Sequence, residues 1–475
     1  MNHLLAAMRR RVGWRMAVLL AALVALSPNA LPLSVTENFR RAEAASAAGD
    51  YAAAADALAN AAARLPYDGY LEYRAGLADI SAQLFEPAIR RLRRAGDLLG
   101  WNMALRVALG DAYLGYGDRA AAVEQWELAL SDLPADRALL TRLANNYEAL
   151  GRYPDAIHAL NRQAQAGDAD PALLYRLALL TAVTEPVNAI ARLNVVINVP
   201  GPLTSQAQSL LQAVEGGLNE GDDAYTFGRV GYVLIQLKEW ALAEHALVQA
   251  VTLNPEYADA NAYLGLALDM QKKDGEAAYA EAVRLQPDSP LAQYLFGLHY
   301  RQAGESTRAL PYLQAAQKLD PENPAIAAEI AGAYTAQNDL INAEAWFSKA
   351  VTLAPGSAEF WLLLARFHVD NDYKVVEQGL PAARMAVGLD PNSAPAADAL
   401  GYALVLTGDF VNGEKSLQKA LQLDPNLASA YYHYGLFYTA QNKTEQAKDA
   451  LNHALALDPQ GPVGSLALKA LATLP

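Results

Sequence analysis

The sequence predicts an all-α fold, a solenoid of helix–turn–helix units that follow one another along most of the chain. Residues 290–321 and 324–355 align without a gap at a spacing of 34 residues, and a fixed period of this length indicates one supersecondary unit copied many times. Much of the 53% apolar content is alanine and leucine, both strong helix formers. A proline near the end of each copy stops the helix, because the residue before proline avoids the α conformation.

The N-terminus has the charge pattern of an export signal or a signal-anchor. Four arginines between residues 9 and 15 precede residues 16–35, which are largely apolar and carry no charge. A cationic flank before such a run is typical of both segment types, and twenty residues are enough to cross a bilayer. Pro28 directly follows the small residues that end the apolar run, which disfavours cleavage there. We therefore expect residues 1–35 to be an uncleaved transmembrane anchor, with a removed signal peptide or a buried first helix as alternatives.

Orientation follows from the same arginines. Positively charged flanks stay in the cytoplasm, so the repeats are expected on the extracytoplasmic side of a bacterial-type membrane, attached by a single N-terminal helix. If the signal is removed, the alternative is an exported soluble protein.

The repeats are expected to form two arrays with a break in register between them. A degenerate array occupies residues 36–199, and a regular array of seven units occupies residues 224–459. Residues 200–223 contain Pro-Gly-Pro and a polar stretch, and we expect a spacer helix with a linker there. A hinge and a misshapen repeat that packs into the stack are both open interpretations. Residues 460–475 are expected to form a capping helix.

The units resemble the tetratricopeptide repeat family. Small residues in the first helix, an aromatic residue in its last turn, alanines in the second helix and a terminal proline recur together. One unit carries all of these features: Gly110, Tyr113, Ala122, Trp126, Ala129 and Pro134. We count about twelve units, which start near residues 35, 69, 103, 137, 171, 224, 258, 290, 324, 358, 394 and 428. The resemblance implies a right-handed superhelical solenoid that binds proteins or peptides.

Composition excludes several partner classes. The formal net charge is −14, and a body of this sign repels nucleic acid and anionic lipid surfaces. The chain has no cysteine, which excludes disulfides, thiolate zinc sites and a cysteine nucleophile. The expected contacts are a protein or peptide partner and, through residues 16–35, the membrane.

The sequence offers no catalytic constellation. None of the seven histidines has a partner at the spacing of a metal-binding helix motif, and neither a phosphate-binding glycine loop nor a nucleophile elbow is present. His368 stands where other units have tyrosine and is expected to pack in the core. We therefore expect a non-enzymatic protein without a cofactor or a metal site.

One stripe of the first helices carries the candidate binding residues. Positions 2, 5, 9 and 12 of each unit point in nearly the same direction around the axis of the first helix, which has 3.6 residues per turn. In proteins that this chain resembles, the stripe lines the concave face and holds peptides. Tyrosine and arginine often anchor interfaces. The candidates are Tyr225, Tyr232, Tyr294, Arg301, Arg366, Asp398, Tyr402 and Tyr432.

These side chains would suit an extended peptide that carries a carboxylate or an aromatic group. The alternative is that the tyrosines pack between neighbouring first helices. The predicted function is a scaffold of the cell envelope that binds a peptide or protein in its groove. An assembly or stability subunit of a membrane complex that acts partly through its anchor, and an accessory factor in envelope polysaccharide export, are the alternatives. The oligomeric state and the partner's identity are left open.

Overall fold

The computed structural model describes residues 33–167 and 170–474, and within them the chain forms 26 α-helices and no β-strand. The predicted anchor lies almost entirely outside the described residues. Of its apolar segment, the structure assigns residues 33–35 to the first helix of the first repeat, where Val35 is fully buried. None of the described helices has the length and apolar character needed to span a membrane.

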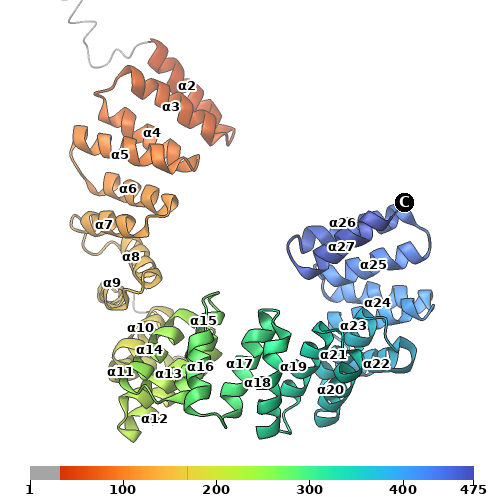
Figure 1. Cartoon of the computed structure of the whole chain (residues 1–475). Helices are drawn as coiled ribbons and strands as arrows, with labels where there is room; N and C mark the ends of the chain where they lie inside the picture. Colours follow the sequence, from red (N-terminus) through yellow and green to blue (C-terminus); the bar gives the residue numbers. More distant parts are fainter. Residues whose placement is uncertain (1–32, 168–169, 475) are drawn as a thin grey trace, which may run out of the picture. The chain divides into compact units, whose positions relative to one another are not determined.

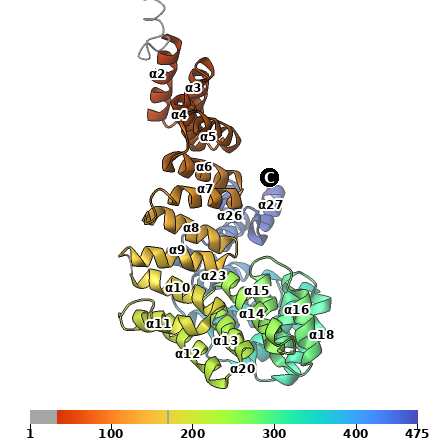
Figure 2. The ribbon, with the colours of Figure 1, turned by 90° about the vertical axis from the view of Figure 1, so that its left-hand side faces the viewer.

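The helices pair into antiparallel hairpins, as the 34-residue period predicts. The first five hairpins are α2 (Leu33–Ala47) with α3 (Tyr51–Arg64), α4 (Gly69–Ser81) with α5 (Phe85–Leu99), α6 (Met103–Tyr116) with α7 (Arg119–Leu130), α8 (Arg137–Ala149) with α9 (Tyr153–Gln165), and α10 (Pro171–Thr184) with α11 (Pro186–Ile197). Figure 2 shows α2 to α11 stacked in chain order.

Seven further hairpins follow. They are α13 (Asp223–Gln236) with α14 (Trp240–Leu253), α15 (Ala258–Asp269) with α16 (Glu276–Leu285), α17 (Pro290–Gln302) with α18 (Ser306–Leu319), α19 (Pro324–Ala336) with α20 (Leu340–Leu353), α21 (Ala358–Asp370) with α22 (Leu380–Leu389), α23 (Ala394–Leu406) with α24 (Phe410–Leu423), and α25 (Ala428–Ala440) with α26 (Thr444–Leu457). Two helices stand outside the hairpins, α12 (Thr204–Glu220) and α27 (Pro462–Thr473), and α27 packs on α26 (Figure 1).

The chain divides into two compact units, one ending at Gln212 and the other beginning at Ala213, so that the boundary falls within α12. This position lies inside the range 200–223, where the sequence breaks its register. The C-terminal part of α12 approaches α13 closely, because Gly217 lacks a side chain. A Cβ atom there would lie 2.5 Å from the Cα atom of Thr226.

Short polar side chains start many of the helices. The carboxylate of Asp136 accepts a hydrogen bond from the Leu139 amide at 2.8 Å, and Asn323 caps α19 in the same way. Such N-caps satisfy amides that have no partner within the helix. After Pro134 and Pro321, such a polar residue begins the first helix of the next repeat.

In several hairpins a glycine in the first helix lets a bulky residue of the second helix pack against its backbone. Gly110 faces Trp126, and Gly435 faces Leu451. In both pairs the bulky residue lies 16 positions after the glycine, and a Cβ atom on either glycine would come within 2.6 Å of it. The small residues that recur in the first helix of each repeat are thus contact points between the two helices of one unit.

Two units depart from the common length, and both absorb the change in the second half of the hairpin. The short unit joins α15 to a ten-residue α16, and its glycine-to-bulky spacing drops to 14 residues, from Gly265 to Tyr279. The long unit inserts a π-helix, η1 (Val375–Gly379), before α22. Rare π-turns occur mostly as single-turn bulges in α-helices, and this one takes up the extra length of the unit.

Candidate functional site

All eight candidate residues lie on first helices of hairpins in the second unit. Tyr225 and Tyr232 are on α13, and the remaining six are on α17, α21, α23 and α25: Tyr294, Arg301, Arg366, Asp398, Tyr402 and Tyr432. Contacts between consecutive first helices gather them into three groups. The groups differ in how many of their charged and aromatic side chains already have partners within the protein.

The first group joins α13 to α15 through aromatic contacts. The Tyr232 ring lies 5.0 Å from the ring of Tyr263, and the Tyr225 ring lies 6.4 Å from that of Tyr257. The Arg229 guanidinium sits over the Tyr225 ring at 5.6 Å. These tyrosines pack between neighbouring helices, which is the alternative that the sequence left open.

The second group joins α17 to α19. Arg301 forms an ion pair with Glu329, and its side chain is only about a third exposed. Burial raises the pKa of Glu329, and the Arg301 charge partly offsets that effect. Burial also raises the pKa of the neighbouring Tyr294. A partner carboxylate would therefore have to compete with Glu329 for Arg301, which weakens the expectation that this arginine anchors an acidic peptide.

The third group, which we call the α21–α25 cluster, contains Arg366, Asp370, Asp398, Tyr402, Ser429, Tyr432 and His433. Its centre is Asp398, which is 4% exposed. The two Asp398 carboxylate oxygens contact Ser429 Oγ and His433 Nδ1, each at 2.7 Å. Because a carboxylate can only accept hydrogen bonds, Nδ1 of His433 carries the proton in this pair. The His433 ring stacks on Tyr402 at 4.1 Å with an interplanar angle of 14°.

The outer part of the cluster is open to solvent. Asp370 and Arg366 are both half exposed, and the Arg366 guanidinium lies 4.0 Å from the Asp370 carboxylate. Desolvation nevertheless raises the pKa of Asp370, while His433 and Arg366 act in the opposite direction. Burial likewise raises the pKa of Tyr402 and Tyr432, and the Asp370 charge contributes to both shifts.

The cluster therefore offers one incompletely compensated carboxylate beside two tyrosine rings. A cationic side chain placed there would gain an ion pair with Asp370 and contacts with the Tyr402 and Tyr432 rings. The sequence analysis identified Arg366, Asp398, Tyr402 and Tyr432 but missed Asp370 and His433. A usable signal for His433 is its spacing of 35 residues from Asp398, one repeat plus one position, which places both on neighbouring helices.

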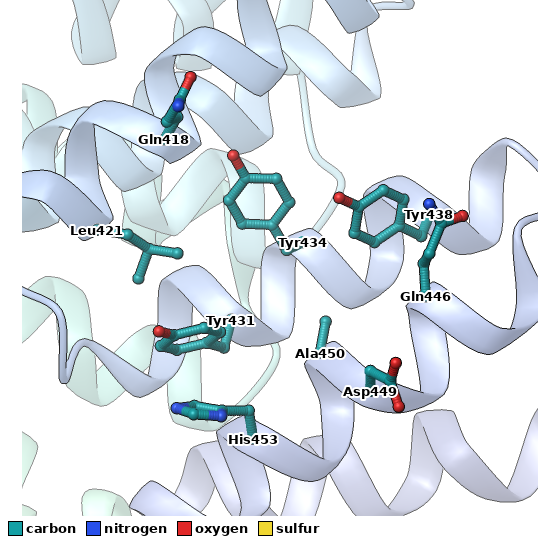
Figure 3. A pocket seen from close by; sticks show the side chains of 9 residues that line it. All are labelled: Gln418, Leu421, Tyr431, Tyr434, Tyr438, Gln446, Asp449, Ala450 and His453. Atoms are coloured by element: carbon teal, nitrogen blue, oxygen red, sulfur yellow. The ribbon is translucent and has the colours of Figure 1, made fainter.

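A separate pocket of about 430 Å³ lies on another face of α25, between α24 and α26. Tyr431, Tyr434 and Tyr438 line it in a row (Figure 3). The Tyr431 ring lies 4.1 Å from the His453 ring, and Tyr434 Oη donates to the Glu414 carbonyl at 3.2 Å. Because helical residues one position apart differ by about 100°, Tyr431 and Tyr432 point to different surfaces. The pocket is thus distinct from the α21–α25 cluster.

Stacked helical hairpins with these small-to-large contacts define a helical-repeat protein of the interaction-scaffold class. Residues 231–290 and 294–358 match one family model described as a tetratricopeptide repeat, and residues 404–471 match a second. These three stretches are tetratricopeptide repeats, which confirms the resemblance that the sequence predicted.

Curated relatives share part of the chain. The human cell division cycle protein 16 homolog is 28% identical over 192 residues, which is 38% of this chain and 31% of that protein. The mouse protein of the same name matches with the same figures. The matched stretch thus covers about a third of the length of these relatives.

Several solved structures are similar to this chain at low identity. Yeast Tom70 is 17% identical with a TM-score of 0.39, and the match covers 85% of this chain and 96% of Tom70. YrrB, described as a tetratricopeptide repeat protein with an unusual peptide-binding site, is 22% identical with a TM-score of 0.31, over 41% of this chain and 97% of YrrB. A tetratricopeptide repeat protein from Parabacteroides merdae is 16% identical with a TM-score of 0.43, and the match covers 56% of this chain and 98% of that protein.

Proposed function

We propose that this protein is a non-catalytic scaffold that holds an extended segment of a partner protein across α21, α23 and α25. The observation that carries the proposal is the half-exposed Asp370 carboxylate, which has only a long contact with Arg366 and lies near enough to Tyr402 and Tyr432 for its charge to act on both. Aromatic rings on a rigid scaffold lose little entropy on binding, which is one reason why they anchor interfaces. The buried Asp398–His433 pair holds one of these rings in place through its stack on Tyr402.

The partner segment is proposed to place a lysine or arginine at Asp370. The carboxylate has Arg366 nearby, but the contact of 4.0 Å between half-exposed groups is long, and exposed pairs of this kind contribute little, about 0–1 kcal/mol. A bound cation restores the charge compensation that desolvation makes favourable. Arg301 is already paired with Glu329, so the proposed ligand is basic and aromatic rather than acidic.

The binding test uses fluorescently labelled peptides of matched length, one set rich in lysine and aromatic residues and one rich in glutamate. We expect the basic set to bind, and Asp370→Asn to weaken binding about tenfold, the equivalent of about 1.4 kcal/mol. Tyr432→Ala should have a similar effect. Asp97→Asn is the matched control, because Asp97 is exposed on α5 in the other unit. Selection of the acidic set, or unchanged affinity in both variants, would contradict the proposal.

The same measurement has a defined pH dependence. Burial raises the pKa of Asp370 above its ordinary value, and the facing groups that modify it are His433, Arg366 and Asp398. The peptide needs the ionised carboxylate, so binding should decrease as the pH falls through this raised pKa. The decrease should begin at a higher pH than for an ordinary aspartate and should be absent in Asp370→Asn. Fluorescence anisotropy between pH 4 and 7.5 measures it.

We further propose that the protein is held in a bacterial-type membrane by residues 1–35, with the repeats on the extracytoplasmic side. The arginines before the uncharged segment 16–35 support this orientation. Membrane fractionation with protease protection tests it, and we expect the repeats to be digested once the outer barrier is opened. Continued protection of the repeats would exclude this orientation. A partner captured only when residues 1–35 are present would instead favour an assembly subunit that acts through its anchor.

A further inference from the structure

Three side chains with metal-binding chemistry meet where α16 and α17 adjoin. Asp274, Glu276 and His299 each present one ligand atom, and these atoms all lie within 4.8 Å of one another. Asp274 lies in the loop before α16, and Glu276 is the first residue of α16. His299 lies on α17 of the next repeat. The site is separate from the α21–α25 cluster.

The shortened hairpin creates this arrangement. Asp269 ends α15, and its Oδ1 atom accepts a hydrogen bond from the Gly275 amide at 3.1 Å, which closes the loop between them. The Glu276 amide donates to Asp274 Oδ1 at 2.9 Å. A side chain at position 275 would bring its Cβ atom 2.5 Å from the Gly265 carbonyl oxygen. The tight loop therefore fixes where Asp274 and Glu276 stand relative to α17.

One nitrogen of the His299 ring is fixed by a carboxylate. Its Nδ1 atom lies 2.8 Å from Asp269 Oδ2, and the same oxygen accepts a hydrogen bond from Tyr279 Oη at 3.1 Å. Since the carboxylate can only accept, Nδ1 carries the proton and Nε2 keeps its lone pair. A carboxylate that holds the far nitrogen of a histidine is the usual outer-shell partner of a metal-bound imidazole.

Glu276 is held in the same manner, with one oxygen engaged. Its Oε1 atom accepts hydrogen bonds from Tyr300 Oη and from Arg308 Nη2, both at 2.8 Å. Neither hydrogen bond uses Oε2. The positive charge of Arg308 is shared with Glu305, whose carboxylate it contacts at 2.8 Å. Each of the three ligands thus has one atom tied to the protein.

We propose that Asp274, Glu276 and His299 bind one divalent ion of the zinc type, with water completing the coordination. One imidazole and two carboxylates suit zinc, whereas calcium and magnesium select oxygen ligands alone. Ligands about 2.0–2.2 Å from zinc lie closer together than 4.8 Å, so the three side chains must move toward one another on binding. The ion would tie the loop of one repeat to the first helix of the next.

The test is a titration of the untagged full-length protein with zinc chloride by calorimetry, with elemental analysis after dialysis. We expect one zinc per chain, and at least a tenfold loss of affinity in His299→Gln and in Asp274→Asn. The second variant changes an exposed loop residue, so it separates lost ligation from lost folding. Asp269→Asn should weaken binding by about 10–100-fold through the orientation of His299.

The matched control is His453→Gln, which removes an exposed histidine from α26. It should leave the zinc affinity unchanged. Zinc should also raise the Tm of the natural protein and of His453→Gln but not that of His299→Gln. Absence of bound zinc, or equal zinc affinity in the natural protein, His299→Gln and Asp274→Asn, would overturn the proposal.

Discussion

Replacing Trp126 with alanine is expected to lower the free energy of unfolding by about 3–5 kcal/mol, the range for truncating a large buried aromatic residue. Trp126 on α7 is 1% exposed, and its Nε1 atom donates a hydrogen bond to the Val107 carbonyl at 3.3 Å. The indole fills the space above Gly110, where a Cβ atom would lie 2.3 Å from Nε1. Alanine leaves a cavity that the two helices cannot close without moving.

Urea denaturation followed by circular dichroism measures this effect, and Trp101→Ala is the control. Trp101 is also a tryptophan of the first unit, but it is 39% exposed, so its removal should have a clearly smaller effect. In a solenoid each repeat contacts only its neighbours, so the loss at Trp126 should appear as earlier unfolding of the first unit. Equal effects of the two substitutions would show that the glycine–tryptophan contact does not hold the hairpin together.

The fold was predictable because its determinants are local and repeated. The hairpins begin at or within two residues of the unit starts that the 34-residue period predicts. Glycine opposite a bulky residue 16 positions later is visible in the sequence, as Gly110 and Trp126 show. The π-helix η1 was not predictable in the same way. Two extra residues fit a hairpin in several ways, and only packing against α21 and α22 selects one.

The candidate site was predictable by position but not by chemistry. Helical periodicity places Arg301 and Arg366 on one stripe, but it cannot say that Glu329 neutralises the first while the second has only a long contact with Asp370. Those pairings depend on side-chain conformations across neighbouring repeats. His299 was equally invisible as a ligand, because its partners lie on another repeat rather than at a helix-motif spacing.

Replacing Asp398 with alanine is expected to cost about 2–4 kcal/mol of folding free energy. The change removes the acceptor of both His433 Nδ1 and Ser429 Oγ, and His433 is only 7% exposed. A buried polar group that loses its partner costs about 1–3 kcal/mol, and more where a charge is involved. The stack of His433 on Tyr402 should loosen as well, so binding of the basic peptide should weaken in the same variant.

A double-mutant cycle decides whether this pair acts as one element. Residues in contact show coupling energies of about 0.5–3 kcal/mol, whereas distant pairs are additive. Asp398→Ala and His433→Ala should therefore couple, both in urea denaturation and in peptide affinity. Coupling in stability alone would mean that the pair supports the fold without positioning Tyr402 for a ligand. A carboxylate and an imidazole 2.7 Å apart must influence each other. Additive effects in both measurements would therefore show that Asp398 and His433 are not in contact in solution.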